Sequence, residues 1–552
     1  MGSWPDDHDP EEWSRHERAR PVAGVAVSDD AGNTRPIGEA PPLPPVPPGS
    51  TRVEGERGHR RPEARPLGSV LGWTALNAVV PGTAFFAAGR RRLGAAVLLV
   101  TALLVAGGVW LATAGRRTAL RLAVDSDSLV WLIGGLAVLA TAWIAVIVAG
   151  HRALLPRRSS RPRLLLGAVL VTALVAAVAY PAYRVGTVAV AQRGLLDGVF
   201  ASDRESATVV DTPDPFGTKE RVNVLLLGGD GGEGRDGVRT DTVIVASIET
   251  ATGETTLFSL PRNLEDLPFP ASSPLAAVYP EGFDSGSESE SLLNAVYRNG
   301  PADHPDILGP TDDPGADFLK LGVGEALGLP IDYFVLVNLD GFSRLVDALG
   351  GITVNVNYYV PINGEPTRGI LPDDYIAPGP DQRMDGATAL HFARGRFGLT
   401  DYDRMDRQRC TINAIIAEAD PVTLLDQYQE LAATTQDIVS TDIPQSALGD
   451  FVDLAFLVKD AEIRSVVFDT SLIDPAYPDY PRIRQIVQES ITPATAPPPA
   501  PGDSASGADQ GSGQTPPPPP PAPAADVGDA CAYDPAQAQA ALAEGKPPTR
   551  NG

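Results

Sequence analysis

Apolar residues form long uninterrupted runs in the first third of the chain. Residues 93–114, 129–150 and 164–183 each make a run of about 20 residues without a charged side chain. That length crosses the hydrocarbon core of a bilayer, and soluble proteins rarely place three such runs in succession. The pattern predicts three transmembrane helices within residues 93–185, with the lipid bilayer as a partner.

A fourth apolar stretch, residues 67–89, is interrupted by Pro81 and Gly82. Arginines cluster at 90–92 and at five positions between 152 and 163, and the positive-inside rule places both clusters on the cytoplasmic side. Both ends of 67–89 then face the cytoplasm, which predicts a re-entrant hairpin, with four full spans as the alternative. Either count predicts a multi-span protein of the cell membrane with an extracytoplasmic C-terminal domain.

After the membrane region the pattern changes to short apolar strands that alternate with helices. Strands are predicted at 221–228, 243–248, 255–260, 333–339 and 352–356. This alternation is typical of an α/β fold, so we expect an α/β domain with a central mixed sheet over residues 221–490, preceded by an all-α transmembrane region.

The segments that flank these two regions are polar or rich in proline. We expect residues 1–66 to be a disordered cytoplasmic tail and residues 491–552 to be a disordered Pro/Ala/Gly-rich tail. Residues 186–220 are predicted to hold an amphipathic helix followed by a linker.

Charge is divided unevenly along the chain, whose formal net charge is −25. Residues 1–204 carry 23 arginines and no lysine against 16 acidic residues, a balance of +7, and the remainder has a balance of −32. Because nucleic acid selects a basic surface, the acidic C-terminal part argues against nucleic acid as a partner. It remains compatible with a small basic site on an acidic body.

Such a site is indicated at residues 391–409, which contain five arginines and three aspartates. One helix is predicted to end near Arg394 and Arg396, and a second to begin after Thr400 or Asp401. The second helix would place Arg404, Arg407 and Gln408 on one face. Guanidinium groups that converge from two elements suit an oxyanion such as pyrophosphate, whereas a self-neutralised solvated surface is the alternative.

Two aspartates flank the first predicted turn of the α/β domain. Asp230 follows one strand and Asp241 begins the next, so a hairpin-like return would bring both carboxylates to one rim. Oxygen donors of this kind suit Mg²⁺, and ordinary turn residues are the alternative. Arg239 lies on the same strand face as Asp241, and Arg262 ends the third strand.

Six ordered motifs now identify a resemblance: NVLLLGGD (223–230), RTDT (239–242), SLPRN (259–263), LNAVYRNG (293–300), VDALGGITVNV (346–356) and MDGATALHFARGR…DYDRMDRQR (384–409). In order and spacing they resemble the LytR-CpsA-Psr family over about residues 220–425, and the membrane region resembles an actinobacterial subgroup. The resemblance implies an α/β/α domain that transfers a glycopolymer from a polyprenyl-pyrophosphate carrier to a peptidoglycan acceptor, with Mg²⁺.

The resemblance also implies roles for single residues. Asp230 and Asp241 would hold the metal, and Asp241, Arg262, Arg394 and Arg396 would be catalytic. The pyrophosphate would be bound by Arg239, Arg262, Arg394, Arg396, Arg404, Arg407 and Gln408. The chain departs from the family pattern at Asn263, where an aspartate is common, and at Leu292, where a lysine is common.

The chemistry that follows is a phosphotransfer in which an acceptor hydroxyl attacks the sugar-linked phosphorus. Asp241 and Asp401 are alternative bases, and the stretches 335–339 and 345–349 are expected to line an apolar slot for the prenyl chain. A hydrolase of the same substrate and a non-catalytic lipid-pyrophosphate binder are alternative functions.

The chain has two cysteines, Cys410 beside the arginine-rich helix and Cys531 in the C-terminal tail. Two cysteines in an oxidising compartment predict one disulfide between them, with two free thiols as the alternative.

Overall fold

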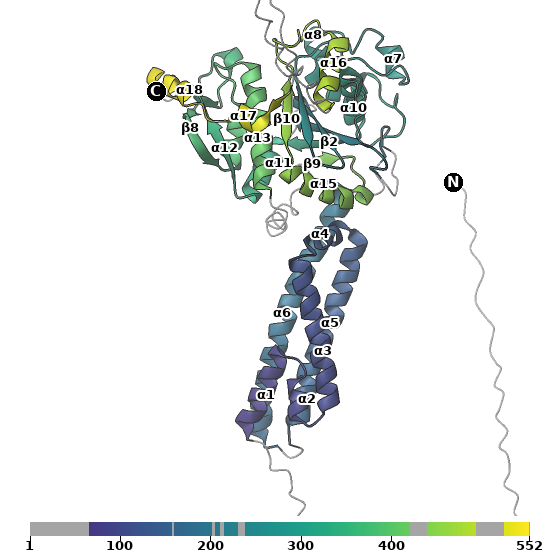
Figure 1. The fold of residues 1–552 in the computed structure, drawn as a ribbon, viewed down its shortest axis with the longest axis vertical. Coiled ribbons are helices and arrows are strands. Elements are labelled where there is room, and N and C mark those ends of the chain that lie inside the picture. Colours follow the sequence, from purple (N-terminus) through teal and green to yellow (C-terminus); the bar gives the residue numbers. More distant parts are fainter. Residues whose placement is uncertain are drawn as a thin grey trace, which may run out of the picture. The chain divides into compact units, whose positions relative to one another are not determined.

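The computed structural model describes residues 66–156, 159–200, 205–209, 215–229, 238–419, 439–492 and 524–550 (Figure 1). The predicted tail 1–66 lies outside the described residues except for its last residue, and so does the predicted metal ligand Asp230. The described residues contain three helices that are long and apolar enough to cross a membrane. They are α3 (Arg91–Ala112), α5 (Ser126–Leu154) and α6 (Arg161–Val199).

The interrupted apolar stretch forms two short helices, α1 (Leu67–Val79) and α2 (Thr83–Ala87), each too short to cross a bilayer core alone. The turn between them is closed by the buried side chain of Asn77. Its Oδ1 accepts hydrogen bonds from the backbone N–H groups of Gly82 and Ala84, and its Nδ2 donates to the carbonyl of Val146 in α5. The Pro-Gly break therefore produces a compact helical pair packed on α5.

One predicted boundary in this region is wrong. Helix α6 continues to Val199, so no separate amphipathic helix begins at 186, because the end of an apolar run marks the edge of a bilayer and not the end of a helix. The connection between α3 and α5 contains another helix, α4 (Arg116–Val124). Arg121 of α4 forms an ion pair with Asp453 of α15 (Leu448–Asp460).

The central sheet has seven strands in the order β11-β10-β3-β2-β1-β4-β9. The pairs β1/β4 and β3/β10 are parallel and the other neighbours are antiparallel, which confirms the predicted mixed sheet. Its strands are β1 (Arg221–Gly229), β2 (Thr240–Glu249), β3 (Thr255–Leu260), β4 (Tyr333–Asn338), β9 (Val439–Thr441), β10 (Ile463–Val467) and β11 (Ala525–Asp526). Two further antiparallel pairs join β5 (Ile352–Val356) to β8 (Gly379–Met384) and β6 (Val360–Ile362) to β7 (Asp374–Ile376).

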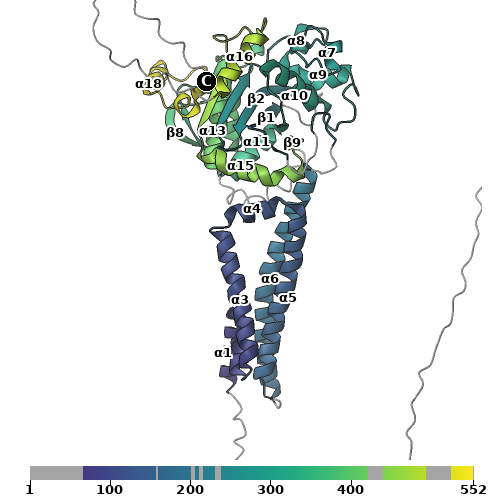
Figure 2. The ribbon, with the colours of Figure 1, turned by 45° about the vertical axis from the view of Figure 1, so that its right-hand side comes forward.

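Helices cover both faces of the sheet, and Figure 2 shows β1 and β2 between α9 and α10 on one side and α13 on the other. Alternate residues of one strand enter different layers. Val245 packs with Phe318 of α10 in one buried cluster, whereas its neighbour Ile244 packs with Ile412 of α13 in another. The fold is thus the predicted α/β/α arrangement. The remaining helices are α7 (Leu275–Val278), α8 (Glu288–Ser291), α9 (Leu293–Asp303), α10 (Pro314–Leu327), α11 (Leu339–Ala348), α12 (Gly386–Arg394), α13 (Asp401–Glu418), α16 (Tyr480–Ile491), α17 (Val527–Ala530) and α18 (Pro535–Glu544), with short 3-10 turns at Pro366–Arg368 and Gln445–Ala447.

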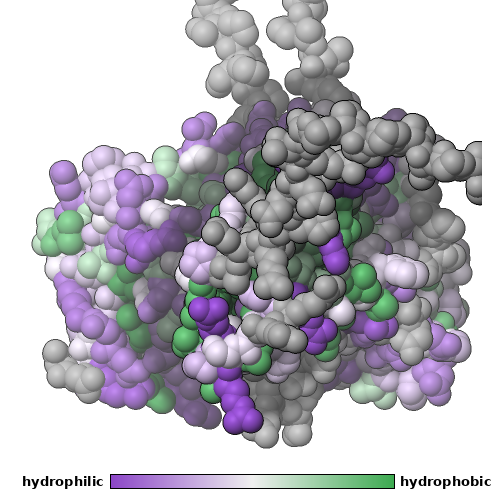
Figure 3. Space-filling view, turned by 90° about the horizontal axis from the view of Figure 1, so that it is seen from below, coloured by the Kyte–Doolittle hydropathy of each residue, from purple (hydrophilic) through white to green (hydrophobic). Residues whose placement is uncertain are grey.

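The prediction that residues 491–552 are disordered is wrong for residues 524–550. Strand β11 pairs with β10 at the sheet edge, and Val527 is fully buried against Leu257 and Ile463. The sequence prediction followed the proline-rich composition of the preceding segment and so overlooked the short apolar contact that Val527 makes. Seen from below, hydrophilic and hydrophobic residues are interspersed on this face of the molecule (Figure 3).

Candidate functional site

Two helix termini place the arginine-rich residues beside the sheet. Helix α12 ends at Arg394 and α13 begins after Thr400, as predicted. The Thr400 hydroxyl accepts a hydrogen bond from the Asp403 N–H, and the Asp403 carboxylate accepts from the Thr400 N–H, which forms a capping box. This cap fixes the first turn of α13, which carries Asp401 and Arg404.

Three arginines converge on two carboxylates, that of Asp241 at the start of β2 and that of Asp401 at the start of α13. The Arg262 Nη1 lies 2.9 Å from Asp241 Oδ1, and its Nε lies 3.3 Å from Asp401 Oδ1. The Arg404 Nη2 lies 3.0 Å from Asp401 Oδ2 and donates to the Asp241 carbonyl at 3.2 Å. Arg396 Nη1 reaches within 4.0 Å of Asp401. We call these five residues the arginine cluster.

Electrostatics keep Asp241 and Arg404 of the cluster ionised. Burial alone would raise the pKa of the Asp241 carboxyl, but Arg262, Arg404 and a hydrogen bond from Asn294 outweigh burial and hold that pKa below its ordinary value. Burial lowers the pKa of Arg404 to about 10, against the opposing effect of Asp401, and Arg404 remains charged at neutral pH. The site therefore presents charged guanidinium groups that are only partly neutralised by carboxylates.

Arg404 is 3% exposed, and its Nε is buried without a hydrogen-bond partner in the described structure. The Asp401 Oδ1 also accepts no hydrogen bond in the described structure, although it forms an ion pair with Arg262 Nε at 3.3 Å. Buried polar atoms are usually paired, so the Arg404 Nε is a donor available to a water, an ion or a ligand at this site.

Gln408 extends the cluster along β2, because its Nε2 donates to the Thr242 hydroxyl at 2.8 Å. A bare backbone at Gly228 makes room for this contact. A Cβ atom on Gly228 would lie 2.9 Å from the Thr242 Cβ and Oγ1. The glycines that end β1 thus allow β2 to present Thr242 to α13.

Arg407 faces away from the cluster. Its Nε donates to the Phe392 carbonyl at 2.7 Å, its Nη1 to the Tyr358 hydroxyl at 2.8 Å, and its Nη2 to the Gly395 carbonyl. The residue is 4% exposed. These contacts tie α13 to the last turn of α12, so Arg407 is a positioning residue in this structure.

Replacing Arg407 by leucine should lower the free energy of unfolding by about 1.5–3 kcal/mol, because the Phe392 and Gly395 carbonyls lose a charged donor. Thermal unfolding measures this effect, and Arg368→Leu on an exposed turn is the control with an expected change within about 0.5 kcal/mol. Unchanged stability combined with lost pyrophosphate binding would instead make Arg407 a ligand contact.

The remaining predicted residues lie around this centre. Arg239 Nη2 pairs with Glu290 of α8 at 2.6 Å, and Arg394 is exposed at the end of α12. His391 is partly buried one turn earlier, and burial together with Arg394 lowers its pKa. The sequence prediction missed two residues, Asn294 and Glu290. Asn294 donates to Asp241 Oδ1 at 3.2 Å. The matched motif LNAVYRNG was the available signal for Asn294.

Asp241 has the chemistry of a metal ligand, since it is ionised and offers oxygen to a hard cation. Within the described ranges no group of three or more His, Cys, Asp or Glu side chains is close enough to hold a metal ion. The second predicted ligand, Asp230, lies outside those ranges.

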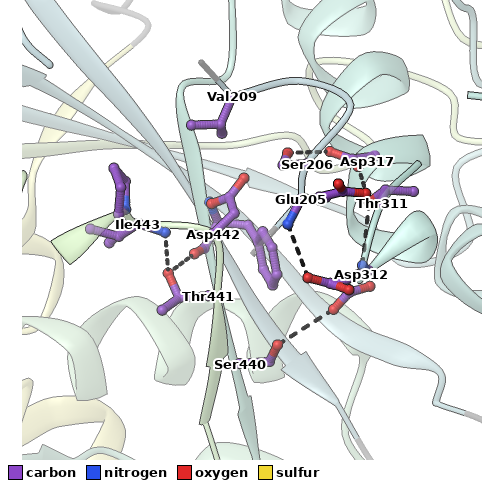
Figure 4. A pocket seen from close by; sticks show the side chains of 13 residues that line it. Glu205, Ser206, Val209, Thr311, Asp312, Asp317, Ser440, Thr441, Asp442 and Ile443 are labelled. Atoms are coloured by element: carbon purple, nitrogen blue, oxygen red, sulfur yellow. Dashed lines mark hydrogen bonds between the residues drawn. The ribbon is translucent and has the colours of Figure 1, made fainter. Parts of the chain in front are cut away.

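A pocket of about 360 Å³ lies elsewhere in the domain and contains none of the predicted site residues (Figure 4). Asp312, Asp313, Asp317 and Asp442 line it. Because these side chains are acidic, the pocket is unsuited to pyrophosphate. The two stretches predicted to line a prenyl slot contribute to separate buried clusters, Leu336 to one and Val346 to another, and the slot stays a prediction.

Comparison with known proteins decides the family. Residues 199–475 match the model of the LytR_cpsA_psr family, which is half of the chain. The chain belongs to the LytR-CpsA-Psr family. The matched range includes every predicted site residue and the whole arginine cluster.

Two similar relatives are named polyisoprenyl-teichoic acid–peptidoglycan teichoic acid transferase TagU. The protein of Enterococcus faecalis is 31% identical over 232 residues, which cover 41% of this chain and 62% of the relative. The protein of Bacillus subtilis is 26% identical over 242 residues, covering 44% and 64%. The match thus spans less than two thirds of either relative.

Solved structures of the family also resemble the chain. Bacillus subtilis TagV is 23% identical with a TM-score of 0.34, and the match covers 49% of this chain and 97% of TagV. A structure described as TagT bound to LIIa-WTA is 20% identical with a TM-score of 0.34, covering 53% and 96%.

Proposed function

We propose that this LytR-CpsA-Psr protein transfers a glycopolymer, by its sugar-phosphate end, from a polyprenyl-pyrophosphate carrier to peptidoglycan in the cell envelope. The observation that carries the proposal is the convergence of Arg262, Arg396 and Arg404 around the carboxylates of Asp241 and Asp401. The names of the relatives support the same substrate class for them. We further propose that the domain lies outside the cell and that α3, α5 and α6 anchor it in the membrane.

In the proposed reaction the acceptor hydroxyl oxygen attacks the phosphorus that bears the sugar. The bond between this phosphorus and the bridging oxygen breaks, and polyprenyl phosphate leaves with the electron pair. Arg262, Arg396 and Arg404 neutralise the charge that develops on the phosphate oxygens. The hydroxyl proton passes to Asp241 or Asp401, both of which lie at the cluster.

Each arginine has a distinct position in this scheme. Arg404 is buried and is held by the Asp401 carboxylate and the Asp241 carbonyl, so it offers a preorganised donor. Arg262 and Arg396 have more exposed side chains, at 29% and 38%, and can rearrange when the substrate arrives. Gln408 and Thr242 are placed to position the adjoining phosphate.

We propose Mg²⁺ as the cofactor, with Asp241 and Asp230 as its protein ligands. A bound Mg²⁺ would neutralise pyrophosphate oxygens during the transfer. The ionised state of Asp241 fits this role. Arg262 and Asn294 both donate to Oδ1 of Asp241, and they orient the carboxylate.

The purified full-length protein in lipid nanodiscs, given a polyprenyl-pyrophosphate glycan, should form a glycan–peptidoglycan product only when peptidoglycan is added. The assay separates the alternatives, since release of glycan phosphate to water without acceptor indicates a hydrolase, and binding without turnover indicates a regulator. EDTA should abolish transfer and Mg²⁺ should restore it. Full transfer in EDTA would contradict the metal proposal while leaving the transferase proposal intact.

A further inference from the structure

Glu290 joins two arginines at the edge of the site. Its Oε1 lies 2.6 Å from Arg239 Nη2, and its Oε2 accepts from Arg298 Nη2 and, at 2.9 Å, from the Asn299 amide. The Asn299 amide also donates to the Glu290 carbonyl at 2.8 Å, and Arg298 Nε donates to Asn299 Oδ1 at 2.8 Å. None of the sequence motifs assigned a role to Glu290 or Arg298.

Helix α9 connects this group to the arginine cluster. Asn294 in its first turn donates to Asp241, and its backbone N–H donates to the Arg262 carbonyl at 3.0 Å. Arg298 and Asn299 in the next turn hold Glu290. One short helix therefore fixes Glu290 relative to the two residues at the centre of the site.

The contacts of Glu290 are divided between its two oxygens. Arg239 uses Oε1, whereas Arg298 and Asn299 use Oε2. If Arg239 moved to another anion, Glu290 would keep two donors and would stay in place. The Arg239–Glu290 pair is about one-third exposed on both sides, and such pairs are weak enough for a more highly charged anion to replace.

We propose that Glu290 is an internal counter-anion of Arg239, which the incoming pyrophosphate displaces while Arg298 and Asn299 retain the Glu290 carboxylate. This rests on the proposed function, in which Arg239 contacts the pyrophosphate. Glu290 thereby sets how strongly the site binds anions, and it favours highly charged ligands over singly charged ones. The hydrogen bond from Asn299 and the two arginines hold the pKa of Glu290 below its ordinary value, which keeps the carboxylate ionised at neutral pH.

The test measures binding of inorganic pyrophosphate to the full-length protein by isothermal titration calorimetry. Glu290→Gln keeps the shape of the side chain and removes its charge, and should tighten binding about two- to fivefold, the range expected for loss of one partly exposed ion pair. Glu288→Gln on the same helix removes the same charge from an exposed position and should leave the affinity near that of the unaltered protein.

The outcomes separate the inference from the proposed function. Weaker binding by Glu290→Gln would mean that Glu290 merely positions Arg239, and equal tightening by both variants would mean a general charge effect; either result overturns the inference and leaves the proposed function standing. No pyrophosphate binding by the unaltered protein or by either variant would instead contradict the proposed function.

Arg298→Gln supplies an independent check. In the unaltered background it should weaken pyrophosphate binding, because Glu290 loses the charge of Arg298 and its carboxylate then binds Arg239 more strongly. In the Glu290→Gln background the same change should have no effect, since the competing carboxylate is absent. An equal loss in both backgrounds would make Arg298 a direct ligand contact and would overturn the inference.

Discussion

Replacing Arg404 by alanine should lower glycopolymer transfer about 10²- to 10³-fold, the loss typical of removing one preorganised donor to a developing oxyanion. Arg404 is 3% exposed and bridges the Asp241 carbonyl and the Asp401 carboxylate. Transfer of a polyprenyl-pyrophosphate glycan to peptidoglycan, measured as a steady-state rate, checks this result.

Arg404→Lys distinguishes charge from geometry. A lysine keeps one positive charge but lacks the planar fork that reaches two acceptors, so most of the activity should still be lost. Arg344→Ala is the matched control, because Arg344 forms an exposed ion pair with Asp340 in α11. Thermal unfolding of each variant identifies any loss caused by misfolding. Near-normal transfer by folded Arg404→Ala would remove this residue from the site.

Removal of the disulfide should lower the melting temperature by roughly 4–16 °C. Cys410 and Cys531 are bonded in the structure, with Cα atoms 5.5 Å apart and a separation of 121 positions in sequence. A cross-link over a long loop typically contributes about 2–4 kcal/mol, and each kcal/mol shifts the melting temperature of a domain of this size by about 2–4 °C. The Cys410→Ser, Cys531→Ser double variant, studied by thermal unfolding, tests the value.

The reducing agent provides the control for this experiment. Dithiothreitol should lower the melting temperature of the unaltered protein and should leave the double variant unchanged. Non-covalent contacts of the tail remain in both cases, among them hydrogen bonds from Asn355 and Asn357 to the carbonyls of Cys531 and Ala532. If reduction left the unaltered protein as stable as before, these contacts alone would account for the docking of the tail.

The two expected effects meet on helix α13. Cys410 lies two residues after Gln408, and Ile412 and Ile416 pack with Val527 of the tail under the sheet edge. The tail and its disulfide therefore hold the C-terminal half of the helix whose first turns supply Arg404. Loss of the cross-link should lower stability more than it lowers transfer activity, because the contacts of Arg404 and Gln408 to β2 do not involve the tail.

Much of the fold follows from local pattern in the sequence. Apolar length predicted the three long helices, and apolar runs bounded by turn residues predicted β1 to β5 within a few residues. The helix start at Thr400 followed from its side-chain chemistry, because a hydroxyl next to an acidic first turn satisfies free N–H groups. These properties depend on neighbouring residues alone.

The partners of individual side chains depend on the tertiary structure. Arg404 and Arg407 lie three residues apart on one helix, and the sequence places both on one face. The structure sends Arg404 to Asp241 and Asp401 but Arg407 to the carbonyls that end α12. Helical period reports which side of a helix is buried, but the position of acceptors on other elements decides where a guanidinium group binds.

By itself, then, the sequence determined the three long apolar helices, the α/β/α class and the stretch that carries the arginines, because hydropathy and turn chemistry are local. Only the tertiary structure decided that Asn294 and Glu290 lie at the site, that Arg407 donates to the carbonyls of Phe392 and Gly395, and that residues 524–550 dock on the sheet edge. Each of these depends on contacts between segments far apart in the chain. Such contacts do not alter the pattern of apolar and polar residues within either segment, so the pattern cannot predict them.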